Sequence, residues 1–576
     1  MRRIVRMSAV VMVSVLLATS VVLAAEPASR PDAGFKRVGP QTVTGGPTVD
    51  EYFARQADLH AWLMRETPAG SLANPISVRL TEAELEEINS IQPAGSGPLR
   101  VGTVKQIVEP VRLDCNAVGA RGQRVLCSGD GVLQMTPGGG FVWARAVTSP
   151  GAVGIRVHVT DFHLPDDADL FFYSLDGEAY GPFQRFGPND DGDFWLPSVM
   201  SDTGVLVVRH FGPRGALEIS DVSMTFTEIG HIGEAFNAGA NEAVSRAPGD
   251  LCPYNNQNCV LNASCENTGP ALPAQNAVAK MLWVAGCCIN VCTGGLIGDT
   301  AGSQTPYFLT ANHCLSGNNA AGNLEAFFQY TMGCGAECPA GTFDPAPVTT
   351  KTMGATVKAT NKKGDFTLLE LSQTPPSGSV LLGWDNTPIA SSGGAALHRI
   401  HHPEGAPQAY TEHSVDANIG TCLNTPRGQF IYSTDVHGAT EQGSSGSPVV
   451  NANGDIVGQL TGCCPVGGGN CNDVCDPDNH TIDGALAFYF PNVEQFLDPS
   501  PCTPTTADCE DGADNDCDGL TDCNDTNGGA EDCSAFPACQ SGCVNPGGFP
   551  PGNTCTSDSQ CCSNKCKGPP GNKTCR

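Results

Sequence analysis

The chain has 576 residues, which is enough for three or four domains at about 150 residues each. Its formal net charge of −29 argues against nucleic acid as a partner, because the phosphate backbone would repel it. It contains 28 cysteines, an even number, and in an exported chain this points to a framework of disulfide bonds.

The first residues indicate export. Residues 1–25 have the layout of a secretory signal peptide, with arginines first, then an apolar run, then small residues at Ala24 and Ala25. A membrane anchor is the alternative, but the run is short and no other segment approaches the roughly 18–20 apolar residues that span a bilayer. We therefore expect a secreted, extracellular protein that does not span a membrane, with attachment to the cell surface left open.

Residues 26–100 predict an N-terminal pro-region with short helices. Apolar residues recur at helical spacing over residues 49–66. A second helix is expected after Thr81, which forms a capping box with Glu84.

From residue 101 to 230 the pattern changes to a period of two. Ile155, Val157 and Val159 face one way, and the polar residues between them face the other. Similar short runs follow, separated by Asp, Gly and Pro turns, which is typical of a small β-sandwich. Residues 231–250 are polar and small and predict a linker.

A possible catalytic set lies in the next region, residues 251–498. His313 follows an apolar β run, Asp365 precedes another in KKGDFTLLELS, and Ser445 lies in GSSGSP. The chain order His, Asp, Ser is that of chymotrypsin-type double β-barrels, whereas Ser comes first in α/β-hydrolases. A Ser hydroxyl needs an imidazole to remove its proton, and a carboxylate must hold that imidazole in one tautomer.

The small residues around Ser445 fit the same chemistry. They would let the N–H groups of Gly443 and Ser445 point into one hollow and stabilise an oxyanion. Each residue also has a plain structural interpretation, as a structural His, a turn Asp and a flexible Gly/Ser loop. The three together, in this order and each beside a β run, favour the triad.

Several motifs carry a family resemblance. TANHC around His313 resembles the T-A-x-H-C box of trypsin-like proteases, and GSSGSP resembles their nucleophile box. CVLNASC, TVKATNKKGDFTLLELS, GWDNTPIASSGGAALHRIHHPEG and TEQGSSGSPVVNANGDIVGQLTG are similar to the lysyl endopeptidase group of secreted bacterial serine proteases. The resemblance covers residues 251–498. It implies a chymotrypsin-like double β-barrel, protein or peptide substrates, no cofactor for catalysis, and an upstream β-sandwich acting as the protein's own prodomain.

The resemblance also implies disulfide bonds. By analogy, Cys292 would bridge to Cys314 beneath the His, Cys265 would pair with Cys334, and Cys259 would pair with a Cys of the 463–471 cluster. A bridge at Cys314 would fix the loop that carries the base.

One departure from trypsin concerns maturation. Trypsin has an Asp before its nucleophile that captures a new N-terminal ammonium, and this chain has Ser444 there. Removal of a covering prodomain is therefore the expected activation step, and Arg246 is one candidate cleavage point.

A second departure concerns specificity. The Lys-specific members have an Asp a few residues before the last barrel strand, which DGALAFYF resembles here, and Thr481 takes the place of that Asp. Asp478 or Asp483 nearby could bind a Lys or Arg side chain, with Thr461 as a further pocket residue. Alternatively, Thr481 with His480 would favour an acidic side chain, as in glutamyl endopeptidases. Basic substrates are the expectation.

The segment HRIHHPEG raises a metal interpretation, since it contains His398, His401 and His402. No carboxylate stands at an obvious ligand spacing, and the resemblance makes the segment part of the barrel. We therefore expect no metal there.

Residues 499–540 form an Asp/Cys-rich segment with a possible calcium site. Five Asp residues fall at positions one, three, five, nine and twelve of an EF-hand-like loop, with Gly519 at position six. The interleaved cysteines resemble the calcium repeats of thrombospondin type 3, and a solvated acidic loop is the alternative. The five expected Ca²⁺ ligands are Asp514, Asp516, Asp518, Asp522 and Asp525.

Residues 541–576 resemble a knottin, because Cys561 and Cys562 are adjacent among close Cys neighbours. The sequence thus predicts an all-β secreted serine endopeptidase with a prodomain and a disulfide-rich tail. The alternative from another class is a calcium-dependent surface-binding or adhesive protein that uses a protease-like scaffold.

Overall fold

The structure is a computed structural model. It describes residues 35–89, 97–118, 124–128, 130–137, 139–212, 222–233, 259–266, 268–334, 349–422, 424–465, 468–499, 566–567 and 574–575. The signal-peptide region, Arg246, the five Asp residues of the possible calcium site and most of the knottin-like segment lie outside these ranges.

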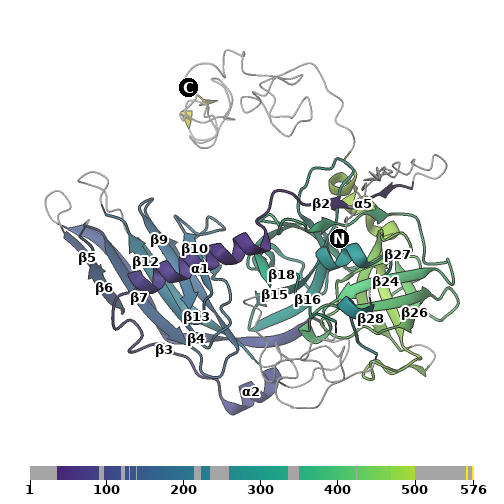
Figure 1. Cartoon of the computed structure of the whole chain (residues 1–576), viewed down its shortest axis with the longest axis horizontal. Coiled ribbons are helices and arrows are strands. Elements are labelled where there is room, and N and C mark those ends of the chain that lie inside the picture. The colour runs from purple at the N-terminus through teal and green to yellow at the C-terminus, as the bar shows by residue number, and fades with distance from the viewer. Residues whose placement is uncertain are drawn as a thin grey trace, which may run out of the picture.

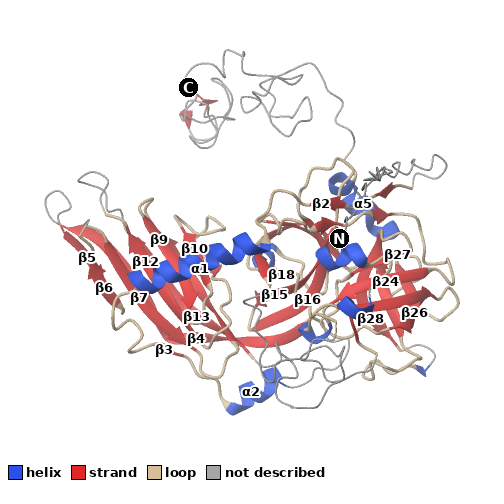
Figure 2. Cartoon of the chain, viewed as in Figure 1, coloured by secondary structure: helices blue, strands red, loops and turns tan. Residues whose placement is uncertain are grey.

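The N-terminal part contains two packed β-sheets (Figure 2). Their inner faces alternate apolar residues such as Ile155, Val157 and Val159, which are fully buried in one core with Phe172 and Leu206. The first sheet has the order β10-β9-β12-β7-β3, with β6 on β7. Its strands are β3 (Ile76–Ser77), β6 (Val132–Met135), β7 (Phe141–Thr148), β9 (Ala168–Ser174), β10 (Ala179–Phe183) and β12 (Thr203–His210).

The second sheet of this part has the order β11-β8-β13-β4, with β5 on β4. Antiparallel pairs with an inner apolar face are typical of a sandwich, so the fold expected for this region is the one observed. The strands are β4 (Leu99–Val118), β5 (Arg124–Ser128), β8 (Gly154–His163), β11 (Phe194–Trp195) and β13 (Val222–Ile232).

Both predicted helices are present. Helix α1 (Val49–Glu66) begins at a capping box between Thr48 and Glu51, and it lays Leu63 on the outer face of the first sheet (Figure 1). Helix α2 (Glu82–Asn89) follows Thr81, whose hydroxyl accepts from the Glu84 N–H at 3.3 Å.

The C-terminal part contains two barrel-like sheets. The first comprises β15 (Val278–Ala285), β16 (Cys288–Leu296), β17 (Tyr307–Ala311), β18 (Glu325–Phe328), β19 (Thr350–Met353), β20 (Ala355–Asn361) and β21 (Phe366–Leu371). The second comprises β23 (Trp384–Asp385), β24 (Ala396–His401), β25 (Ala409–Val415), β26 (Phe430–His437), β27 (Pro448–Asn451), β28 (Ile456–Cys464) and β29 (His480–Ala485), with β14 (Leu261–Asn262) on β25. Two such sheets in sequence are the chymotrypsin-type architecture that the order of the candidate triad predicts.

One sheet crosses the boundary between the two parts. Strand β4 pairs with β16 antiparallel, with Leu99 opposite Val291 and Thr103 opposite Cys288. The twelve-stranded sheet therefore runs from the sandwich into the first barrel (Figure 2). The sequence does not reveal this continuity, because strand pairing between distant segments leaves no local pattern.

The N-terminal segment also lies on the barrels. Strand β1 (Arg37–Val38) pairs with β23, and β2 (Gln41–Thr42) pairs with β22 (Val380–Leu381). Val43 is 2% exposed and belongs to the main core of the C-terminal part. We call residues 36–43 the N-terminal strap.

Two of the implied disulfides are present, Cys292–Cys314 and Cys265–Cys334. The third implied pairing is wrong: Cys259 bonds to Cys475, because Cys463 and Cys471 bond to each other. Two further bridges, Cys422–Cys464 and Cys287–Cys288, are also present.

The segment DGALAFYF is not one strand. Strand β29 ends at Ala485, and helix α5 (Leu486–Leu497) begins at the next residue. The helix buries Leu486, Tyr489, Phe490, Val493 and Leu497, whose three- and four-residue spacing lies on one helical face. The short apolar run alone does not distinguish a strand from this helical pattern.

Candidate active site

His313 and Asp365 are brought together by strand pairing. Strands β17 and β21 are antiparallel partners with Ala311 opposite Phe366, so the turn after β17, which carries His313, meets the residue before β21. His313 Nδ1 lies 2.8 Å from Asp365 Oδ2, and the His313 N–H donates to Asp365 Oδ1 at 2.9 Å. Both carboxylate oxygens thus orient the same histidine.

Asp365 is itself held in place. Its φ of +49° is in the left-handed region, which an Asp tolerates better than most side chains. Its carbonyl accepts from the Asn312 N–H at 3.0 Å and from Gln459 Nε2 at 2.9 Å. Gln459 in turn accepts from the Tyr489 hydroxyl of α5, so this helix supports the backbone of Asp365 through Gln459.

The loop carrying Ser445 is fixed from the first barrel. The Thr293 N–H donates to the Ser445 carbonyl at 2.9 Å, and Thr293 Oγ1 donates to the Gly443 carbonyl at 2.8 Å. Gly446 has a φ of +84°, and a Cβ there would lie 2.2 Å from Thr310 Oγ1. The run of small residues is therefore required by close packing.

The N–H groups of Gly443 and Ser445 donate to no backbone or side-chain acceptor in the part of the chain that the structure describes. The Ser445 carbonyl accepts from the Thr293 N–H, and the Gly443 carbonyl accepts from Thr293 Oγ1. These two bonds give the loop one fixed orientation. Two free N–H groups on a fixed loop can donate hydrogen bonds to an oxygen that becomes negatively charged during the reaction.

Ser444 is fully buried and takes part in holding this loop. Its Oγ lies 2.7 Å from His401 Nδ1 and accepts from the Glu441 N–H at 3.2 Å. Burial lowers the pKa of His401 well below its usual value, so the imidazole is neutral. A neutral Ser–His pair therefore occupies the position where trypsin has its Asp.

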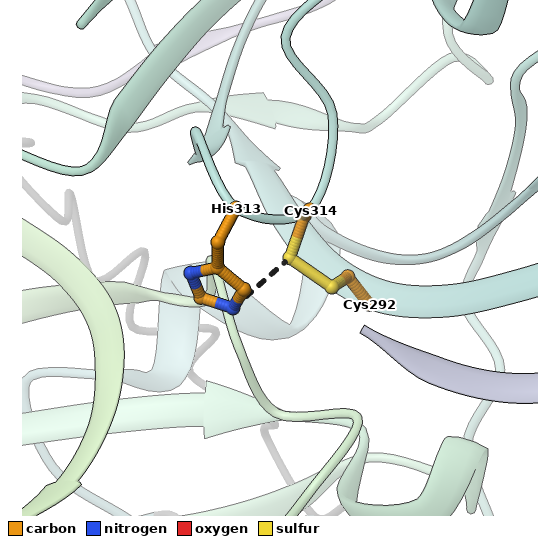
Figure 3. Close-up of side chains that lie close together, drawn as sticks. All are labelled: Cys292, His313 and Cys314. Carbon is orange, nitrogen blue, oxygen red and sulfur yellow. Dashed lines mark hydrogen bonds between the residues drawn. A yellow bond between two sulfur atoms is a disulfide. The ribbon is translucent and has the colours of Figure 1, made fainter. Parts of the chain in front are cut away.

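The disulfide Cys292–Cys314 lies directly beside His313 (Figure 3). Cys314 Sγ is 3.7 Å from His313 Nε2. The two sulfur atoms are bonded to each other and are not free to bind a metal, so the cluster is a rigid support for the histidine loop.

His313, Asp365 and Ser445 all line one cavity of about 1000 Å³. No hydrogen bond joins His313 to Ser445 among the described residues; in enzymes without substrate such contacts are often long and tighten on binding. Among the other residues that line the cavity are Gly97, Lys362, Glu404, Phe430, Thr440, Glu441, Leu460 and Thr461.

The predicted pocket carboxylates do not line this cavity. Asp478 is exposed, and Asp483 is fully buried and paired with Arg399 at 2.6 Å. Asp483 is thus a structural partner of a buried guanidinium. Thr481 is also buried; its Oγ1 donates to Asp435 Oδ1 at 3.3 Å and lies 3.5 Å from Thr440 Oγ1.

Sequence analysis missed two acidic residues of the cavity. Burial raises the pKa of Glu441 to about 7 and raises that of Glu404. Glu441 lies four residues before Ser445, inside the quoted TEQGSSGSP motif, and its distance from the nucleophile could have identified it. Raised carboxyl pKa values in a cleft are typical of functional sites.

The three histidines of HRIHHPEG do not face a common centre. His398 Nδ1 lies 2.9 Å from the Tyr410 hydroxyl, His401 bonds to Ser444, and His402 Nδ1 lies 2.8 Å from the Ala406 carbonyl. Each therefore has its own partner within the barrel.

Comparisons with known proteins agree with this architecture. Residues 255–480 match the family model "Lysyl endopeptidase, C-terminal domain". The chain is 29% identical to a lysyl endopeptidase from Pseudomonas aeruginosa over 342 residues, which cover 57% of this chain and 69% of that protein.

Solved structures give weaker likenesses. The HtrA-type protease AlgW with tripeptide is 16% identical, with a TM-score of 0.26; the match covers 40% of this chain and 62% of that chain. The Rv3671c protease from M. tuberculosis in its active form is 14% identical, with a TM-score of 0.26, over 42% of this chain and 92% of that chain.

The fold and the relatives together define a serine endopeptidase with a chymotrypsin-type fold, acting on peptide substrates. Within residues 255–480 the protease resembles lysyl endopeptidases. In the described part of the chain, no helix is long and apolar enough to cross a membrane.

Proposed function

We propose that this protease cleaves peptide bonds through His313, Asp365 and Ser445. Ser445 Oγ attacks the scissile carbonyl while His313 Nε2 takes its proton, forming a tetrahedral intermediate. His313 then gives that proton to the leaving amine, which leaves an acyl-enzyme on Ser445. Water, deprotonated by His313, hydrolyses the ester and restores the hydroxyl. The two bonds from Asp365 to His313 are the observation that carries this proposal.

The amides of Gly443 and Ser445 form the oxyanion hole. The rigidity of the loop supports this assignment, because Thr293 holds the loop on one side and the Ser444–His401 pair holds it on the other. One such donor is worth about 10²–10³ in rate, because it acts on charge that develops only in the transition state.

A basic side chain, Lys or Arg, occupies the specificity pocket. Glu441 supports this, since it lines the same cavity as Ser445 and ionises near neutral pH. An acidic side chain would face Glu441 and Glu404. His480, the residue that would serve a glutamyl specificity, has Nδ1 3.1 Å from the Asp478 carbonyl and does not line the cavity.

The chain is made as a secreted precursor whose N-terminal part covers the site as a prodomain. This is supported by Gly97, just before β4, which lines the same cavity as Ser445. Because the Ser444–His401 pair already orients the nucleophile loop, maturation needs cleavage in the linker and no new N-terminal ion pair. The leader of residues 1–25 supports export.

The tail adds a calcium-binding segment, supported by the Asp spacing from Asp514 to Asp525. An adhesive role for the tail is compatible with catalysis in the barrels, because the two functions reside in different segments.

A fluorophosphonate probe tests the proposed nucleophile. The processed protein is expected to label stoichiometrically, and Ser445→Ala is expected to lose both labelling and peptide hydrolysis. Ser447→Ala is the matched control, since this buried serine is two residues away in the same loop. Labelling that survives in Ser445→Ala would refute the assignment.

A further inference from the structure

The catalytic cavity is lined by both barrels and carries opposite charges on its two sides. His313 and Lys362 line it from the first barrel, and Glu441 and Thr461 line it from the second. Its volume of about 1000 Å³ is at the upper end of the range for small-ligand pockets. The cavity can therefore hold more of a peptide than the one side chain that faces Glu441.

Lys362 is the only Lys or Arg among the described residues that line this cavity. Its side chain is exposed, and its carbonyl accepts from the Asp365 N–H at 3.3 Å, which fixes its backbone in the turn before the catalytic acid. The two acids nearest to it in the sequence have other partners, since Asp365 bonds to His313 and Glu370 bonds to Lys358. The ammonium group of Lys362 is thus available to a charge on a substrate.

Strand β28 offers a backbone edge along the same cavity. Up to Gln459 it pairs with β27 on one side and with β29 on the other, whereas Gly462 to Cys464 pair with β29 and with no second strand of the described sheets. Thr461 and Gly462 line the cavity, and Thr461 Oγ1 is buried without a hydrogen-bond partner in the described part of the chain. An extended peptide can add to such an edge through main-chain hydrogen bonds.

The extended conformation decides where neighbouring side chains of the peptide point. Successive side chains of an extended chain point to opposite sides. In the proposed function, the basic side chain before the cleaved bond turns toward Glu441 on the second barrel. The residues on either side of it then turn toward the first barrel, where Lys362 lies.

His313 distinguishes these two neighbours. Its Nε2, which gives the proton to the leaving amine, lies on the side of Cys314, whose Sγ is 3.7 Å away (Figure 3). Its Nδ1 faces Asp365 at 2.8 Å, and Lys362 belongs to the turn that leads into Asp365. The residue after the cleaved bond therefore lies toward the disulfide, and the residue before the basic one lies toward Lys362.

We propose that Lys362 is a specificity-determining residue that selects an acidic side chain directly before the basic residue. The preferred substrates then carry Asp or Glu followed by Lys or Arg, with the bond after the basic residue cleaved. This inference rests on the proposed function and extends it by a second subsite. An ion pair at an exposed lysine is screened by salt, so the preference should weaken as the ionic strength rises.

The experiment compares kcat/KM of the processed enzyme for two fluorogenic peptides, Ala-Asp-Lys and Ala-Asn-Lys, which differ only in the charge before the lysine. At low salt the Asp peptide should be favoured about two- to fivefold, the value of a solvent-exposed ion pair, and the ratio should approach one at high salt. A second pair of peptides places Asp or Asn after the cleaved bond and should show no such ratio. Equal values for the first pair at low salt, or an Asp preference only after the bond, would overturn the proposal.

Variants of the turn test whether Lys362 is the cause. Lys362→Gln should bring the Asp/Asn ratio to about one and remove its salt dependence, and Lys362→Glu should invert the ratio. The matched control is Lys363→Gln, because this lysine is the next residue of the same turn and is also exposed but does not line the cavity. It should keep the ratio of the unmodified enzyme, and equal effects of Lys362→Gln and Lys363→Gln would refute the proposal.

Failure of the proposed function gives a different result from failure of this inference. If no peptide is hydrolysed after its lysine, the proposed function is refuted and the second subsite with it. If all the peptides are hydrolysed after lysine at rates that ignore the preceding acid, only the role of Lys362 is refuted.

Discussion

At the scale of single residues, the pocket acid is the most informative side chain. Glu441 has a pKa of about 7 because it is largely removed from water, so it is mostly protonated below that pH. In the proposed specificity, a lysine or arginine side chain of the substrate binds the ionised carboxylate of Glu441. Selectivity for basic over neutral substrates should therefore rise as the pH rises through about 7.

The measurement is the ratio of kcat/KM for matched peptides with Lys or Met before the cleaved bond, from pH 5.5 to 8.5. The ratio removes pH effects on the catalytic step that are common to both peptides. Glu441→Gln should lower the ratio about 10- to 100-fold at pH 8, the value of a hydrogen bond to a charged group, and flatten its pH dependence. A pH-dependent ratio that persists in this variant would locate the specificity elsewhere.

For Asp483, in contrast to Glu441, we expect an effect on stability and none on substrate selectivity. Both side chains are fully buried and lie 2.6 Å apart, so Asp483→Asn would leave an unbalanced guanidinium. We expect a loss of about 3–5 kcal/mol in the free energy of unfolding, measured by denaturant titration, and unchanged Lys/Met selectivity in the folded enzyme. A selectivity change without destabilisation would show that Asp483 contacts substrate.

At the scale of elements, the nucleophile loop needs glycine at position 446 for two reasons, which are its positive φ and the lack of space for a Cβ. Gly446 and Gly378 both have positive φ, at +84° and +87°. A Cβ on Gly446 would meet Thr310 Oγ1 at 2.2 Å and the Thr293 carbonyl at 2.4 Å, whereas nothing lies within 4 Å at Gly378. Only the first substitution must displace the loop that holds Ser445.

Gly446→Ala should therefore reduce kcat about 100-fold or more, because small displacements of the reacting groups cost that much. Gly378→Ala should cost only about 1 kcal/mol of stability and leave kcat unchanged. Fluorophosphonate labelling rates and thermal unfolding separate the two effects. Equal kcat values for both variants would mean that the loop tolerates a side chain at position 446.

At the scale of the whole molecule, the N-terminal part is bound to the barrels at three places. These are the β4–β16 pairing, the buried charges around Lys351, and the N-terminal strap, where Arg37 pairs with the buried Asp455. The strap pairs with β23 and β22 and the sandwich pairs with β16, so the two contact the barrels at different places (Figure 1). This arrangement joins the N-terminal part to the barrels through backbone pairing, buried charges and the strap.

Calcium binding by the tail should be independent of catalysis by the barrels. Asp514→Asn combined with Asp516→Asn should remove terbium luminescence and calcium-dependent heat from the full chain, because two of five oxygen ligands lose their charge. Hydrolysis of a small Lys ester should remain unchanged, since the barrels supply the whole proposed triad. Calcium binding that is unaltered in this double variant would refute the ligand assignment.

The sequence by itself determined the features that depend on local chemistry. Chain order and flanking β runs identified His313, Asp365 and Ser445 as a candidate set, helical spacing predicted α1, and the Thr81–Glu84 capping box predicted α2. Periodicity also predicted two-layer strand packing around Ile155. The periodic signals can be read from the sequence because side-chain direction repeats every two residues in a strand and every 3.6 residues in a helix.

Only the tertiary structure decided the features that depend on distant residues meeting. It bonded Cys259 to Cys475, placed Asp483 against Arg399, brought Glu441 into the cavity, and continued one sheet from β4 into β16. The strand that the sequence suggested for DGALAFYF became a helix after Ala485 because its apolar face had a core to cover. Burial and pairing are properties of the folded whole, so the specificity pocket and the interface could not be read from spacing alone.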